Sequence, residues 1–286
     1  MKKTFLGCLG AFLVLLLIGS LVVNALFFAR DFGTLDTKST VVMPKHPLSA
    51  SRVVEEGADG AGNIALIEVN GVIASFDAAG LGGATMVSYV KQSLEQALAD
   101  DSIKGILIAI NSPGGEVTAS DTLYQAVKAA AEKKPVAVYM ASVAASGGYY
   151  IACGAQKIVA NPTTITGSIG VIMSTLKYKE LMGKVGIEPI TFKSGALKDT
   201  LSGSRDMSEE ERAYIQALVM KMYDRFVKIV AEAREGLTEE QLRNGIADGR
   251  VFLGTEAKEV GLVDEVGYLE DAIQVAKDLA SAPDAG

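Results

Sequence analysis

The chain has 286 residues, a formal net charge of -7 at pH 7, one histidine and two cysteines. The acidic balance argues against nucleic acid as a partner, because phosphate backbones require a basic surface. Cys8 lies in an apolar N-terminal run, Cys153 lies in the globular part, and the single histidine is His46. A disulfide framework and a zinc site of Cys and His ligands are therefore excluded, and we expect no metal or other cofactor.

The N-terminal segment carries a targeting signal. Residues 5–28 contain no charge, and a helix rising about 1.5 Å per residue over this length crosses a hydrocarbon core of roughly 30 Å. Lys2 and Lys3 precede the run, and a positive flank belongs on the cytoplasmic side. We expect residues 1–30 to be a cytoplasmic N-terminus and an uncleaved transmembrane anchor in the cell membrane, with everything that follows on the extracytoplasmic side. A cleaved signal peptide is the alternative.

The next segment lacks any sustained period. Residues 31–61 mix polar residues with Pro, Gly and Ser, which predicts a tether, and His46 lies within it.

Beyond the tether, β-branched runs alternate with amphipathic runs. Strands are expected at 64–74 (turning at Asn70-Gly71), 104–111, 135–141, 157–162, 167–174 and 187–195, and helices at 84–100, 117–133, from near 145, at 174–185 and at 208–235. This alternation predicts an α/β domain with a mostly parallel sheet over residues 62–280, followed by a tail at 281–286. A hairpin at Asn70-Gly71 is the local alternative.

Two glycine-rich turns follow predicted strands. In "INSPGGEV", residues 110–117, Gly114 and Gly115 leave backbone N–H groups unobstructed, and such groups can stabilise an oxyanion, although an ordinary tight turn also explains the pattern. In "VAASGGYYIACG", residues 143–154, Ser146 stands where a helix begins, with the Gly147 N–H beside its Oγ. Ser146 is therefore either a nucleophile or a helix N-cap.

A nucleophilic serine needs a base. Because His46 lies in the tether, only Asp, Glu, Lys or Tyr remain as candidates. A lysine serves when burial lowers its pKa from about 10.4 toward roughly 7 or 8. The segment "TFKSGALKDTLSGS", residues 191–204, offers Lys193 and Lys198, although most lysines are simply solvated. Ser168, in "TITGSIGVIMS", either orients the lysine amine or is a turn serine.

Five ordered blocks resemble a known family. They are "NSPGGEV", "AASGGYYIA", "ANPTTITGSIGVI", "FKSGALKD" and "ADGRVFLGTEAKEVGLVDEVG", and their order and spacing are similar to those of the bacterial signal peptide peptidases of the SppA type, single-copy form. The resemblance extends from Ile64 to about Val275 and includes the N-terminal anchor. It implies a ClpP/crotonase-like fold with repeated ββα-type units, preceded by a single transmembrane helix.

The same resemblance implies roles for individual residues. Ser146 would be the nucleophile and Lys198 the general base of a Ser-Lys dyad, with Lys193 not catalytic. Gly114 and Gly147 would form the oxyanion hole. Ser168 would hold the lysine.

Assembly and substrate also follow from the resemblance. It implies a homo-oligomer, a ring-like octamer with active sites near subunit boundaries, without indicating which protomer supplies Lys198. The expected substrates are signal-peptide remnants and similar apolar peptides in or near the membrane. Two rivals remain: a crotonase-type enzyme acting on acyl-thioesters, and a non-catalytic, membrane-anchored scaffold that binds peptides. In the last block, Arg250 and Asp264 are a candidate structural ion pair.

Overall fold

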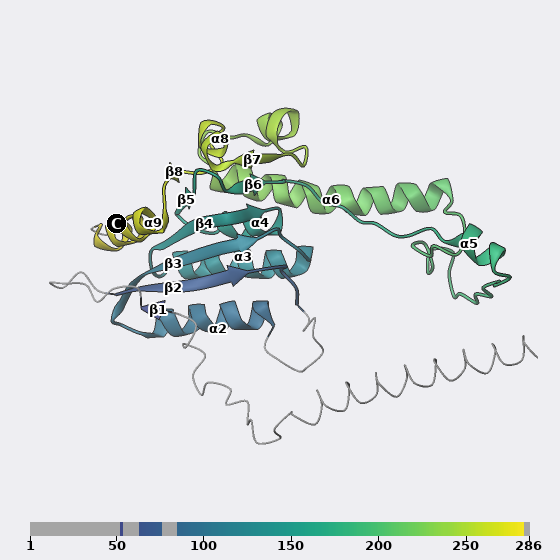
Figure 1. Ribbon diagram of the computed structural model, residues 1–286, viewed down its shortest axis with the longest axis horizontal. Helices are drawn as coiled ribbons and strands as arrows, with labels where there is room; N and C mark the ends of the chain where they lie inside the picture. The colour runs from purple at the N-terminus through teal and green to yellow at the C-terminus, as the bar shows by residue number, and fades with distance from the viewer. Residues whose placement is uncertain (1–51, 54–62, 76–84, 283–286) are drawn as a thin grey trace, which may run out of the picture. The chain divides into compact units, whose positions relative to one another are not determined.

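The computed structural model describes residues 52–53, 63–75 and 85–282 (Figure 1). The predicted anchor, residues 1–30, lies outside the described residues, as do almost all of the tether with His46 and the last four residues of the tail. Among the helices of the described ranges, none combines the length and the apolar character needed to cross a membrane.

A mostly parallel sheet forms the centre of the fold. Its strands run in the order β1 (Arg52–Val53), β2 (Asn63–Asn70), β3 (Ile103–Ser112), β4 (Val136–Ala145), β5 (Lys157–Ala160) and β8 (Glu265–Val266), while β6 (Ile165–Gly167) pairs with β4 and with β7 (Val251–Leu253). Within the described residues, β1 with β2 and β6 with β7 are antiparallel, and the other strand pairs are parallel. The predicted α/β class with a mostly parallel sheet is confirmed.

Helices cover both faces of this sheet, because side chains alternate between the two faces of a strand. Along β2, Ala65, Ile67 and Val69 belong to the core shared with α2 (Met86–Ala99), α3 (Val117–Ala131), α4 (Gly147–Ala152) and α6 (Glu209–Ala233). Ile64 and Leu66 face the other way and pack with Ala272 and Ala276 of α9 (Leu269–Ser281). Shorter helical elements are α5 (Lys179–Lys184), α7 (Glu239–Gln241), a π-helical turn (Leu242–Ile246) and α8 (Gly254–Glu259).

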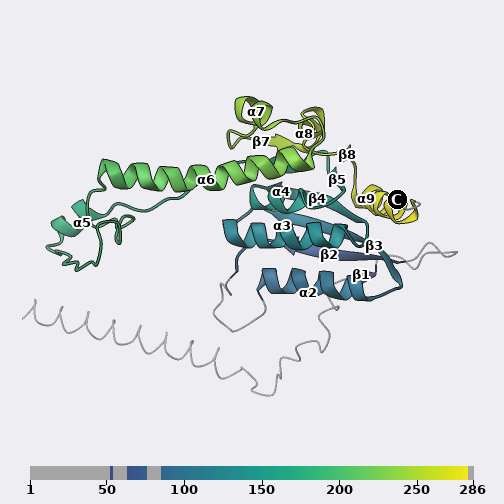
Figure 2. The same ribbon diagram turned by 180° about the vertical axis from the view of Figure 1, so that it is seen from behind.

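Helix α6 links the sheet domain to a projecting segment, residues 172–207, which we call the arm. The helix starts at the predicted capping box, where the Ser208 hydroxyl accepts from the Glu211 N–H and the Glu211 carboxylate accepts from the Ser208 N–H. Apart from Glu211, the buried residues of α6 lie between Phe226 and Val230, so only its second half packs on the domain. Figures 1 and 2 show the arm, with α5, at the end of α6 that is distant from α4.

Three local expectations differ from the structure. Within the predicted strands 167–174 and 187–195, only Gly167 belongs to a strand, as the last residue of β6. The predicted helix 174–185 is shortened to α5. Residues 172–174 of the first segment and all of the second lie in the arm. There, no other strand among the described residues forms backbone hydrogen bonds with them. The hairpin at Asn70-Gly71 is absent as well, because the chain continues to Ile73, which pairs in parallel with Gly115.

The expected ion pair between Arg250 and Asp264 is wrong. Arg250 donates to Asp248, two residues away, on the surface. Asp264 instead pairs with the buried Arg234 of the α6 C-terminus at 2.8 Å and accepts a hydrogen bond from the Ile158 N–H of β5. This pair joins α6 to the sheet, a contact between segments far apart in the sequence.

We expect Arg234→Ala to lower the free energy of unfolding by about 3 kcal/mol, because it leaves the partly buried Asp264 carboxylate with only the more exposed Lys157, at 3.5 Å, as its ion-pair partner. The exposed pair of Arg250 provides the control, and Arg250→Ala should cost less than about 0.5 kcal/mol. Urea unfolding of the two variants measures both.

Burial opposes ionisation of Asp264, but Arg234 more than offsets it and holds the pKa below 3.8. The stabilisation is therefore complete above about pH 4 and is lost as the pH falls through the folded pKa.

Candidate active site

Ser146 occupies a strained turn between β4 and α4. Its backbone angles are φ 50° and ψ -117°, a combination that favours glycine and resembles the first central position of a type II′ turn. A non-glycine residue there costs on the order of 1–3 kcal/mol. Two hydrogen bonds hold the turn, from the Ser146 N–H to the Gly167 carbonyl (2.8 Å) and from the Tyr150 N–H to the Ser146 carbonyl (2.9 Å). The side chain makes no capping hydrogen bond, which removes the N-cap interpretation.

The two glycine turns meet at this serine. A Cβ built on Gly114, whose φ is +99°, would lie 2.6 Å from the Gly147 nitrogen and 2.9 Å from the Ser146 Cβ. A Cβ on Gly147 would lie 2.3 Å from the Ser120 Oγ. Only glycine permits such close approach of the two turns. The structure therefore brings Ser146, Gly114 and Gly147 together.

The backbone N–H groups around Ser146 are not equally available. The Gly114 N–H donates to the Ser112 Oγ at 3.1 Å. Within the described residues, no hydrogen bond engages the N–H of Gly115 or of Gly147. The Gly115 nitrogen is also close, at 3.3 Å from the Cβ position built on Gly147. The sequence pattern pointed to the N–H groups of both Gly114 and Gly115, and the family resemblance chose Gly114. In the structure it is the Gly115 N–H that is unengaged.

Ser168 lies beside Ser146 at the ends of paired strands. Ala145 is opposite Gly167 in the β4–β6 register, so the next residues on the two strands are the two serines. Ser168 has φ 51°, and its N–H donates to the Arg250 carbonyl at 2.7 Å. Ser146 and Ser168 are the non-glycine residues with positive φ in the described part of the chain. Strain of this kind is concentrated at functional sites.

A small apolar cavity of about 20 Å³ opens beside Ser146 and Gly147. Its walls include Val117, Met222 and Phe226, none of which sequence reasoning identified. Tyr150 also lines it and donates to Asp121 at 2.7 Å, while Arg225 pairs with the same carboxylate. Burial, and then the hydrogen bond to Asp121, raise the pKa of Tyr150 well above 10.0, so this tyrosine does not act as a base near neutral pH.

Lys198 does not lie at this cavity. It is exposed in a run of turns in the arm, with its N–H donating to the Gly195 carbonyl at 3.2 Å, and it is absent from the residues that line the space beside Ser146. The arm lies at the opposite end of α6 from α4 (Figure 1). Within one protomer the structure thus groups Ser146, Gly114, Gly147 and Ser168 and leaves Lys198 apart.

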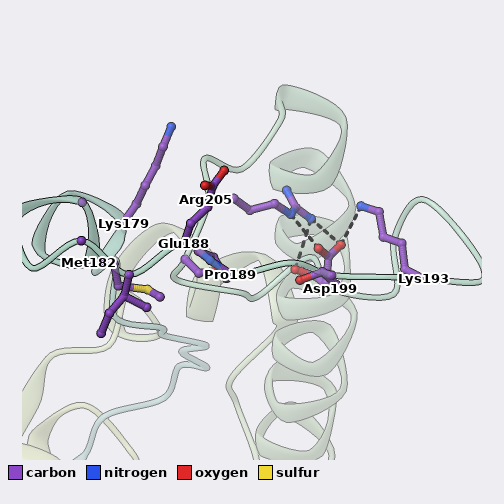
Figure 3. Close-up of a pocket in the computed structure, with 12 residues that line it drawn as sticks. Lys179, Met182, Glu188, Pro189, Lys193, Asp199 and Arg205 are labelled. Carbon is purple, nitrogen blue, oxygen red and sulfur yellow. Dashed lines mark hydrogen bonds and ion pairs between the residues drawn. The ribbon is translucent and has the colours of Figure 1, made fainter.

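A second, larger cavity of about 690 Å³ lies in the arm. Figure 3 shows Asp199 between Arg205 and Lys193, which both donate to its carboxylate. Hydrogen bonds from Arg205, and then from Lys193, hold the pKa of Asp199 well below 3.8. Sequence reasoning missed this cluster because its members are ordinary surface charges when each is considered alone.

The arrangement at Ser146 suits acyl transfer. A serine hydroxyl stands at the start of a helix, next to two backbone N–H groups that no described residue uses, and such donors stabilise the oxyanion of a tetrahedral intermediate. Comparisons with known proteins agree with this chemistry. The model for peptidase family S49 matches residues 128–282, and the Clp protease model matches residues 84–166.

Curated proteins are similar over most of the chain. A protein of Enterococcus faecium named "Putative signal peptide peptidase SppA" is 41% identical over 81% of this chain and 67% of its own length. A Methanocaldococcus jannaschii protein named as a protease is 46% identical over 68% of this chain, and Protease 4 of Salmonella typhi is 38% identical over 78%. The match spans 61% of the Methanocaldococcus protein and 35% of the Salmonella protein. A ClpP1 mutant from Listeria monocytogenes, 20% identical, aligns over 73% of this chain and 94% of its own with a TM-score of 0.48.

The chain belongs to peptidase family S49, among relatives named as serine proteases and signal peptide peptidases.

We expect Ser146→Gly to raise the free energy of unfolding by about 1 kcal/mol, because glycine relieves the positive φ. Ser146→Ala removes the same hydroxyl but keeps the strain, so its stability should stay within about 0.5 kcal/mol of the wild type. Denaturant unfolding of both variants gives the comparison. Equal stabilities for the glycine and alanine variants would contradict strain at this turn.

Proposed function

We propose that the protein is a membrane-anchored serine endopeptidase that uses a Ser146–Lys198 dyad to degrade cleaved signal peptides and similar apolar peptides. The observation that carries this proposal is the strained Ser146 at the start of α4, beside the unengaged N–H groups of Gly147 and Gly115. Unpaired backbone donors beside a partly exposed serine hydroxyl are what acyl transfer to a serine requires.

The reaction follows the acyl-enzyme route. Lys198 accepts the Ser146 proton, and the alkoxide attacks the carbonyl carbon of the scissile peptide bond. The Gly147 N–H and an N–H of the Gly114–Gly115 turn stabilise the oxyanion. Protonated Lys198 then gives its proton to the leaving amine, and water hydrolyses the ester with the lysine again as base. Ser168 holds the lysine amine in position for both proton transfers.

Lys198 comes from a neighbouring copy in this proposal. Two observations support it: the lysine is in the arm, at the end of α6 distant from α4, and the arm exposes large apolar side chains. Ile172 is 91% exposed and Phe192 is 94% exposed, and apolar exposure on this scale is typical of an interaction surface. Docking of the arm on a neighbour would bury these side chains and remove water from the lysine, as a base requires. A ring-like homo-oligomer, an octamer by family resemblance, satisfies this geometry at every subunit.

The anchor places this activity at the membrane. An uncharged segment at residues 5–28 would hold the catalytic domain on the extracytoplasmic side of the cell membrane, where signal-peptide remnants remain after cleavage of preproteins. The apolar walls of the cavity beside Ser146 fit such substrates.

Ser146→Ala and Lys198→Ala should each abolish cleavage of a fluorogenic signal-peptide substrate. Co-assembly of the two inactive variants in equal amounts should restore about a quarter of wild-type activity, because each site in a closed ring combines one copy's serine with its neighbour's lysine. Lys193→Ala, in the same segment, is the control and should retain activity. Cleavage that survives in Lys198→Ala rules out the dyad, and a mixture that stays inactive places both residues in one protomer.

The cavity beside Ser146 should restrict the residue that precedes the scissile bond to small side chains. Met222 forms part of its wall, so Met222→Ala should raise kcat/KM for a leucine peptide relative to the alanine peptide by about 10-fold. The exposed Met220, on the same helix but outside the cavity lining, supplies the control Met220→Ala. An unchanged preference in Met222→Ala would locate the specificity pocket elsewhere.

A further inference from the structure

The residue that follows Lys198 is held by an arginine. Asp199 accepts hydrogen bonds on its carboxylate from the Arg205 Nε (2.8 Å) and Nη2 (2.7 Å), and its carbonyl accepts a third from the same guanidinium (3.1 Å). Paired donors from one guanidinium fix both the distance and the orientation of a carboxylate. Arg205 thus immobilises the backbone immediately after Lys198.

The same guanidinium reaches the first turn of α6. The Arg205 Nη1 donates to the Glu211 Oε2 at 2.9 Å, and its Nη2 donates to the Glu211 Oε1. Glu211 is itself fixed, because its Oε2 accepts from the Ser208 N–H at 2.8 Å and its side chain is only 7% exposed. Arg205 therefore connects the turns that contain Lys198 to the rigid start of a long helix.

Charge pairing in this cluster leaves Lys198 available. Lys193 also donates to the Asp199 carboxylate, at 2.7 Å, so two cations occupy the acidic group nearest to Lys198 in the sequence. Within the described residues, no hydrogen bond or ion pair engages the Lys198 ammonium. A lysine paired with a carboxylate is stabilised as a cation and is a poor base. Because Arg205 and Lys193 already pair with Asp199, its carboxylate does not form an ion pair with Lys198.

We propose that Arg205 is a positioning residue for Lys198: by clamping Asp199 to Glu211, it fixes the backbone that presents the lysine and keeps the Asp199 carboxylate engaged. This inference rests on the proposed function. Lys198 lies in an exposed run of turns. The local hydrogen bonds of this run are Lys198 N–H to the Gly195 carbonyl, Thr200 N–H and Oγ1 to the Leu197 carbonyl, and Ser202 N–H to the Asp199 carbonyl. Such turns alone hold a side chain loosely, and a displacement of about 1 Å can reduce catalysis by about 100-fold.

The test is Arg205→Ala in the full-length protein, assayed with a fluorogenic peptide that has alanine before the scissile bond. We expect kcat to fall at least about 10-fold while KM stays within about 2-fold, because the lysine and not the peptide site is disturbed. Arg205→Lys should recover only part of kcat, since an ammonium lacks the guanidinium fork. The control is Lys177→Ala, which removes the ion pair with Asp206 (2.6 Å) in the same arm without touching Asp199, and it should keep wild-type kcat.

Each outcome is decisive. Wild-type kcat in Arg205→Ala, with Lys198→Ala inactive, overturns the clamp but leaves the dyad intact, whereas activity in Lys198→Ala overturns the proposed function itself. An equal loss of kcat in Lys177→Ala would show a general requirement for the arm, and would also overturn the clamp. If Arg205→Ala does not assemble, the isosteric Asp199→Asn carries the test, and unchanged kcat in that variant overturns the inference.

Discussion

The positive φ of Ser146 is the constraint on which the rest of the site depends. Ser146 turns β4 directly into α4 with a φ of 50°, which strains a non-glycine residue, so its neighbours must hold it. Gly114 and Gly147 permit the close backbone contact that does so, and the Gly167 carbonyl fixes the Ser146 N–H from the adjacent strand. The same contact leaves amide donors beside the hydroxyl. Strain, glycine packing and the candidate oxyanion hole are therefore one structural feature.

Helix α6 is the second feature on which the proposed site depends. Its C-terminal half is anchored by Phe226 in the core and by Arg234 on Asp264, and it contributes Met222 to the wall of the cavity beside Ser146. Its first turn holds the arm through Glu211 and Arg205, and at a rise of 1.5 Å per residue Glu211 lies about 16 Å along the helix from Met222. Helix α6 thus separates the two halves of the proposed dyad within a protomer.

Sequence patterns predicted the elements whose residues are buried within this chain. Strands β2, β3 and β4 and helices α2, α3 and α6 were expected close to their observed bounds, because their apolar periods reflect burial against one another. The strands expected at 167–174 and 187–195 failed for the corresponding reason: Ile169 is buried in the core, but from residue 172 the apolar residues of both segments lie in the arm, where Ile172, Ile190 and Phe192 are exposed. The ion pair of Asp264 was also misassigned, since Arg234 is distant in sequence and adjacent only in the fold.

The sequence by itself determined the class of chemistry. The single histidine in the tether left Asp, Glu, Lys or Tyr as candidate bases for Ser146, local glycine turns marked Ser146 and the Gly114–Gly115 pair, and the family resemblance gave Lys198, Gly114 and Gly147 their expected roles. Only the tertiary structure decided that Gly115 rather than Gly114 carries a free amide, that Lys198 lies apart from Ser146, and that Arg205 clamps its loop. These are facts about hydrogen-bond partners and distances between separate segments, which no local pattern of residues encodes.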